Sequence, residues 1–131
     1  MAYTPQFNPQ PLGAVTVATP GTPVRLTIAL LNNDPTTGKP ATTLATDPVV
    51  CNKIGLAANP LTHAGAGNTG KIYVGSASLN RTTLAGVIAV IAPGGGYSIT
   101  NNVGMNIYDA SKYYVDADNA GDGLYGSIDT V

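Results

Sequence analysis

The sequence predicts an all-β domain built as an antiparallel sandwich or barrel. The chain has 131 residues, and its 16 Gly and 10 Pro recur throughout as turn signals. Between these turns lie about eight short apolar or β-branched segments, spaced about 8–15 residues apart, as in sandwiches and barrels. Glu is absent and Lys and Arg total only 6, so the chain lacks the usual residues of exposed helix faces. A helical bundle or coiled coil is therefore excluded.

Residues 1–13 are expected to form an extended arm, and residues 14–131 a single domain. Pro5, Pro9 and Pro11 make a helix or a central strand unfavourable here. The aromatic side chains of Tyr3 and Phe7 give such an arm an anchor on a partner. A frayed terminus is the alternative interpretation.

The next elements are two strands and a long loop. Residues 14–18 are short and β-branched, and residues 19–23 form a Pro/Gly turn. Residues 24–30 place Val24, Leu26, Ile28 and Leu30 at every second position, which predicts a half-buried strand. Residues 32–48 have no sustained period and are predicted to be a long loop, which in a compact domain is usually functional, ordered by a partner or mobile.

Strand signals follow closely from residue 49 onward. The run 84–92 is apolar throughout and bounded by turn residues, which predicts a buried strand. The other expected strands cover residues 49–58, 71–75, 97–99, 105–108, 112–115 and 124–128.

Charge and cysteine content exclude several classes of protein. The formal net charge is −1 and no basic cluster occurs, which argues against a nucleic-acid module. A single Cys excludes an internal disulfide framework and a Cys-based zinc site. No signal peptide or membrane-spanning run is recognisable, so we expect synthesis in a cytoplasm. Only 10% of residues are charged, which favours a surface partly covered by a partner; a neutral monomer is the alternative.

Two glycine motifs imitate phosphate-binding loops. Residues 65–70 match G-x-G-x-x-G, but a loop precedes them and a β-type segment follows, whereas the dinucleotide motif joins a strand to a helix. Residues 94–96 are not followed by Gly-Lys-Ser/Thr. We therefore expect turns at both positions and no nucleotide cofactor.

The Asp-rich segment 116–123 partly imitates a calcium loop. Asp116, Asp118 and Gly121 fit the ligand spacing, but Ala120 stands at position five and Ser127 where a bidentate Glu belongs. A turn connecting two strands is the preferred interpretation. No metal site is predicted.

Candidate catalytic groups are isolated. His63 is the only His, no Ser lies in a G-x-S-x-G elbow, and Cys51 lies in a strand as a small core residue. We therefore expect no enzyme activity. The seven Tyr against one Phe favour a partly wet interface, with ordinary strand packing as the alternative.

Three segments resemble small structural proteins of tailed-bacteriophage virions. They are Asn-Thr-Gly-Lys-Ile-Tyr-Val-Gly at 68–75, the Pro-Gly turn with its following strand at 91–99, and the Asp-rich turn at 114–123. The resemblance covers residues 49–131. It implies a jelly-roll-like sandwich that acts as a capsid decoration, or cement, protein on the virion surface.

The resemblance further implies that the chain bridges major capsid subunits as a dimer or trimer, with no nucleic acid or membrane partner. The arm and the loop 32–48 are the expected clamps. A tail or head–tail component and a carbohydrate-recognition module of a fibre are the alternatives. The candidate interface residues are Tyr3, Phe7, Pro9, Leu12, Tyr113 and Tyr114.

Overall fold

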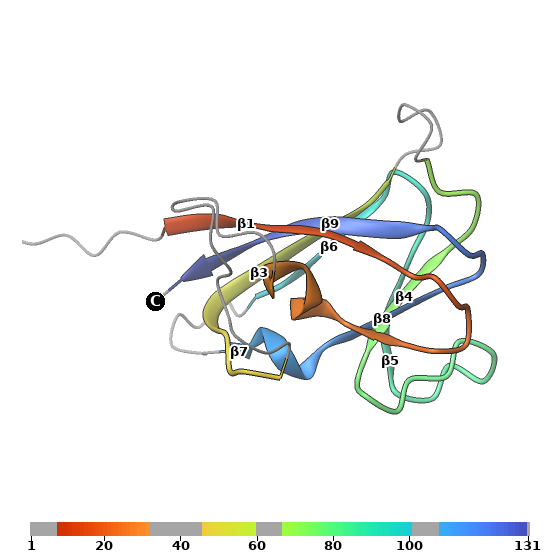
Figure 1. Cartoon of the computed structure of the whole chain (residues 1–131), viewed down its shortest axis with the longest axis horizontal. Coiled ribbons are helices and arrows are strands. Elements are labelled where there is room, and N and C mark those ends of the chain that lie inside the picture. Colours follow the sequence, from red (N-terminus) through yellow and green to blue (C-terminus); the bar gives the residue numbers. More distant parts are fainter. Residues whose placement is uncertain (1–7, 32–45, 60–66, 101–107, 131) are drawn as a thin grey trace, which may run out of the picture.

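The computed structural model describes residues 8–31, 46–59, 67–100 and 108–130, and these form an all-β sandwich of two antiparallel sheets (Figure 1). The fold class predicted from the sequence is thereby confirmed, while the jelly-roll connection stays a prediction. The described part of the chain contains nine strands. They are β1 (Asn8–Thr16), β2 (Val24–Arg25), β3 (Val50–Ala58), β4 (Ile72–Gly75), β5 (Val87–Ile91), β6 (Gly96–Ile99), β7 (Tyr108–Asp109), β8 (Tyr114–Ala117) and β9 (Gly123–Thr130).

The two sheets have the strand orders β1-β9-β3-β6 and β2-β8-β4-β5, with β7 paired to the end of β3. β1 runs beside β9, so the earliest and latest described strands are neighbours (Figure 1). Two short 3-10 helices, η1 (Leu26–Leu31) and η2 (Ala110–Lys112), complete the described elements. Neither has the length or apolar content needed to cross a bilayer, and the described residues contain no other helix.

The core lies between the sheets and is built from alternate residues of the strands. In β3, Ile54, Leu56 and Ala58 are buried and the residues between them are more exposed. This period-two pattern is what a sheet with one covered face requires. The fully buried side chains Leu124 of the first sheet and Val115 of the second belong to the same cluster.

Residues 24–30 were predicted to form one strand, but strand β2 ends at Arg25. The chain leaves the sheet there and continues as the 3-10 helix η1. Leu26 and Leu30 are buried, but Ile28 is 38% exposed. A strand would bury all three, whereas a 3-10 helix with three residues per turn places Thr27 and Leu30 on one side next to Leu26 and directs Ile28 away from them. The burial of Leu26 and Leu30 fits either a strand or a helix. The exposure of Ile28 distinguishes the two.

Residues 1–13 were predicted to form an extended arm, but residues from Asn8 onward are paired in β1, and residues 1–7 lie outside the described part of the chain. Strand β1 is an edge of its sheet, the position at which Pro is tolerated within a sheet. The register shifts between Pro11 and Gly13, and Gly13 has a φ of 94°, a left-handed value that favours glycine. The bulge at this point directs Leu12 into the core, where it is 0% exposed.

The prediction that residues 84–92 form a buried strand is also wrong. Only Val87–Ile91 is a strand, and β5 lies at the edge of the second sheet. Ile88 is 48% exposed and Val90 45%. A continuous apolar run is typical of strands covered on both faces. An apolar strand at the edge of a sheet has the same pattern, so the sequence does not distinguish the two.

Candidate functional site

The outer face of the first sheet carries two adjacent rows of small, uncharged side chains. Partners across an antiparallel pair project from the same face. One row contains Ser98, Gly55 and Ser127, and the next contains Gly96, Ala57 and Tyr125. Tyr125 is the single large side chain of these rows and is 49% exposed. We refer to these six residues as the outer strip.

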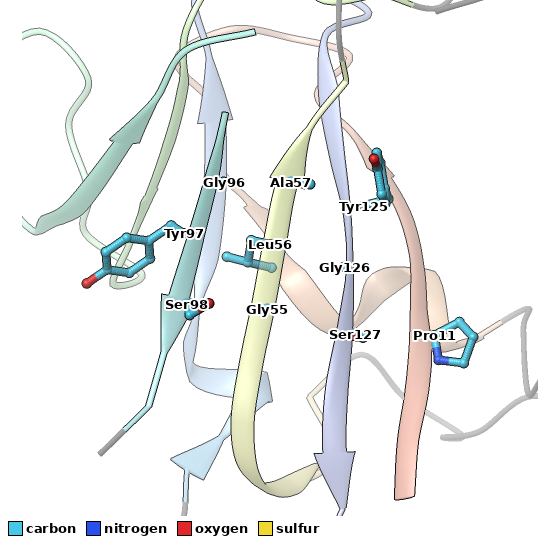
Figure 2. Close-up of a pocket in the computed structure, with 10 residues that line it drawn as sticks. All are labelled: Pro11, Gly55, Leu56, Ala57, Gly96, Tyr97, Ser98, Tyr125, Gly126 and Ser127. Carbon is cyan, nitrogen blue, oxygen red and sulfur yellow. The ribbon is translucent and has the colours of Figure 1, made fainter. Parts of the chain in front are cut away.

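A shallow, open pocket of about 750 Å³ lies over the outer strip (Figure 2). Pro11 of β1 and the chain at Leu56, Tyr97 and Gly126 complete its lining. Gly126 permits close approach of the strands, because a Cβ there would lie 2.3 Å from the carbonyl oxygen of Gly55. On the outer face itself, Gly55 and Gly96 carry no side chains, so the floor of the pocket is low beside the ring of Tyr125.

Tyr97 meets the pocket at its edge. Its partner on β3 is Leu56, whose side chain is buried, so the Tyr97 ring leaves the sheet on the face opposite to Tyr125. Figure 2 shows the Tyr97 ring directed away from β3, beyond β6. The pocket therefore offers one accessible aromatic ring, that of Tyr125.

Other tyrosines predicted for an interface are engaged within the chain. The hydroxyl of Tyr73 donates to Asp118 at 3.0 Å, and burial together with this contact raises the pKa of Tyr73. Tyr113 is half-buried against the core, and burial raises its pKa. The Arg25 guanidinium lies 4.8 Å from the centre of the Tyr114 ring. Tyr113 and Tyr114, both predicted interface residues, thus have contacts within the sandwich.

The predicted arm residues divide into three groups. Tyr3 and Phe7 lie outside the described residues. Pro9 lies in β1, opposite Asp129 of β9. Leu12 packs in the core, so its side chain is not available to a partner.

The pocket itself was not predicted from the sequence. Pro11, Ser127 and Tyr125 line it, yet none was singled out for this position. The usable signal was the run of small residues alternating with buried ones in residues 54–58, which marks a face lacking large side chains.

The carboxylates of the Asp-rich segment hold loops by accepting hydrogen bonds from backbone N–H groups. Asp116 accepts from Gly21 at 3.0 Å, and Asp118 accepts from Lys71 at 3.2 Å. Asp122 accepts from Gly70 at 2.9 Å. Within the ranges that the structure describes, no three His, Cys or Asp side chains gather as a metal-binding group.

Asn68 connects the loop before β4 to the start of β9. Its amide nitrogen donates to the Gly123 carbonyl at 2.7 Å, and the Gly123 N–H donates back to its amide oxygen at 2.8 Å. Asn68 is 0% exposed. Two of the segments that carry the virion-protein resemblance therefore meet here, at what we call the Asn68 clamp.

The expectation that Cys51 is a small core residue is confirmed. Cys51 is 0% exposed, and burial, with the nearby charge of Asp109, raises the pKa of its thiol to about 11. At neutral pH it is a neutral core thiol and hence a poor nucleophile. His63 lies outside the described residues.

No protein-family model matches the chain, and neither the curated proteins nor the solved structures include a significant match to it.

Replacing Asn68 by Ala should destabilise the fold by about 2 kcal/mol, because the buried Gly123 N–H loses its acceptor and the Gly123 carbonyl keeps only the 3.3 Å bond from the Asn59 N–H. The matched control is Asn119→Ala, whose exposed amide donates to the Thr69 hydroxyl and should cost under about 1 kcal/mol. Urea unfolding monitored by Tyr fluorescence measures both. Equal losses for the two variants would show that the Asn68 clamp is not a major constraint.

Cys51 should resist alkylation in the folded protein at pH 8. A pKa of about 11 instead of 9.0 lowers the thiolate fraction roughly 100-fold, and burial blocks access to the sulfur. Because the pKa is raised on folding, the resulting stabilisation is complete below pH 9 and is lost as the pH rises toward 11. Iodoacetamide labelling followed by mass spectrometry tests this, with urea-unfolded protein as control. Labelling at the same rate in both states would contradict the assigned burial.

Proposed function

We propose that this chain is a non-enzymatic structural protein that binds the outside of an assembled bacteriophage capsid and bridges its major capsid subunits, as a decoration protein does. The observation that carries this proposal is the uncharged outer strip on the first sheet. The resemblance of residues 49–131 to small virion proteins supports the identity of the partner.

The outer strip has the composition of an interface centre. Such centres lose charged residues and gain Tyr, because burial of an unpaired charge is costly and Tyr contributes large area with a polar tip. Tyr125 is 49% exposed and stands beside glycine, alanine and serine, so a partner surface can approach the sheet closely. Weak contacts of this kind gain strength when many copies bind one lattice through several subunits.

The use of the carboxylates supports a role without catalysis. Asp116, Asp118 and Asp122 each accept hydrogen bonds from backbone N–H groups of neighbouring loops. General acid–base catalysis needs a carboxyl group that reaches a substrate proton. In this chain the three side chains have structural partners instead.

Carbohydrate recognition is the second candidate, and the pocket favours it. The exposed ring of Tyr125 offers an apolar face, and the hydroxyls of Ser98 and Ser127 border the same pocket. Sites for small ligands combine such an apolar surface with a few polar groups that fix orientation. On this proposal the chain would be a recognition module of a fibre, and its pocket would bind a sugar without the capsid.

Ser127→Lys should weaken binding to capsids stripped of this protein by at least about 10-fold, since it places an unpaired charge at the proposed contact. The control Ala18→Lys adds the same charge at an exposed turn beyond β1 and should bind as wild type. Co-sedimentation with stripped heads, and separately with isolated tails, measures the affinity and the copy number. Wild-type protein that binds tails alone would move the assignment to a tail component. Binding to neither particle would remove the capsid role.

Deleting residues 1–7 tests the clamp role of Tyr3 and Phe7 without removing any of β1. We expect a folded domain that sediments with heads more weakly, because the aromatic anchors are lost. Binding at wild-type strength would remove the clamp role of Tyr3 and Phe7.

Tyr125→Ala separates the carbohydrate candidate from the capsid candidate. On a glycan array the wild-type protein and Tyr125→Phe should bind alike if the ring stacks on a sugar, and Tyr125→Ala should lose binding by roughly 10-fold or more. A wild-type protein that binds no glycan, while it saturates heads, would eliminate the carbohydrate role.

A further inference from the structure

Strand β5 has a free edge on the side away from β4. The second sheet ends there, and in the described part of the chain no other strand pairs with it. Alternate N–H and C=O groups of an edge strand point outward and can pair with another strand. This edge is on the sheet opposite to the outer strip, so it is a separate surface.

The exposed side chains of this edge are apolar. Ile88, Val90 and Ala92 are exposed in alternation with better-covered neighbours. Val90 is opposite Tyr73 on β4, a residue outside the core cluster, so this row projects from the outer face of the sheet. The chain carries no charge from Thr82 to Tyr108. An apolar edge of this kind lacks the Lys or Pro with which monomeric proteins usually prevent strand pairing.

Leu84, just before β5, extends the apolar surface. It is 52% exposed and has a φ of 64°, a left-handed value that is costly for a large residue. Its loop is held by hydrogen bonds from Leu84 N to Asn80 O and from Asn80 N to Ala85 O, both at 2.8 Å. The strained leucine is therefore presented by a fixed loop.

Strand β5 contains a β-bulge, which limits the stretch of its edge that could pair with another strand. Val74 is opposite Ala89 and Gly75 is opposite Val87, so Ile88 is an extra residue in β5. Such a bulge twists an edge locally. Residues 89–92 lie beyond it, and the register from Ala89 to Ile91 is regular.

We propose that a second copy of this chain pairs with the β5 edge, antiparallel, about a two-fold axis at Val90. This register places Val90 beside Val90 of the other copy, at the centre of the regular stretch from Ala89 to Ile91. The exposed row is thus complementary to itself. On a two-fold axis each residue meets its own copy, so any charge there would repel itself; the uncharged segment around residue 90 meets this requirement.

The proposed dimer joins two four-stranded sheets into one continuous sheet. It leaves the outer strip of each copy uncovered, because that strip belongs to the other sheet. The inference therefore stands independently of the proposed function, although a dimer with two exposed strips would also favour bridging.

Disulfide trapping of Val90→Cys tests the axis directly. Paired Cα atoms in antiparallel strands lie about 4.5–5.5 Å apart, within the range that a disulfide spans. We expect rapid self-cross-linking of Val90→Cys under mild oxidation, and much slower self-cross-linking of Ala92→Cys, which lies two residues from the proposed axis. Tyr125→Cys, equally exposed on the other sheet, is the control, and the native Cys51 is buried. If Val90→Cys cross-links no faster than Tyr125→Cys, the proposed axis is wrong.

Sedimentation equilibrium of the uncross-linked protein provides the second measurement. The wild-type chain should form dimers at concentrations up to about 100 μM, and Val90→Lys should shift the association constant at least about 10-fold toward monomer. Tyr125→Lys should dimerise as wild type. A wild-type chain that stays monomeric over this range would overturn the proposal, as would a Val90→Lys variant that remains folded and dimeric.

Discussion

The need to satisfy buried backbone groups at the loop-bearing end of the sandwich shapes the rest of this structure. Asn68 satisfies two such groups at once, because its buried side-chain amide pairs with both the N–H and the C=O of Gly123. Asp122, one residue earlier, accepts from the backbone of Thr69 and Gly70. Buried polar groups without partners are costly, so these contacts determine where β9 begins and how the loop before β4 approaches it.

This use of the acidic residues affects the character of the surface. Asp116 is 1% exposed and Asp122 is 5% exposed, so two of the seven acids contribute little to the outside. Arg81 lies 3.6 Å from Asp118, which balances a third carboxylate locally. Several of the few charged side chains of this protein thus hold loops in place. The outer strip and the β5 edge are correspondingly apolar or neutral, which is the common basis of both proposals.

The sequence was sufficient for the fold class because turn residues and β-branched segments report local structure. Residues 49–58 were predicted as a strand, and β3 begins within one residue of that boundary. The strands at the sheet edges were harder to predict, because an edge depends on which strands pair at long range. Residues 84–92 have the same composition whether covered or exposed, and residues 24–30 satisfy two periods until the exposure of Ile28 is known.

The candidate site was predictable only in part, for a related reason. Tyrosine content indicated an interface, but only the strand register shows that Tyr125 faces outward while Tyr97 leaves the sheet on the other side. Leu12 illustrates the opposite error. It follows three prolines in the sequence, where an extended arm was expected, and a bulge between Pro11 and Gly13 directs it into the core.

The pairing of β1 with β9 has a consequence for how the chain folds. Asn8 is opposite Thr130, and β9 also separates β1 from β3. The first sheet therefore cannot close until nearly the whole described chain has left the ribosome. Contacts between such distant segments require large loops to be ordered first, which slows folding. During that interval the nascent chain exposes apolar strands, and their low charge offers little protection against association with other unfinished copies.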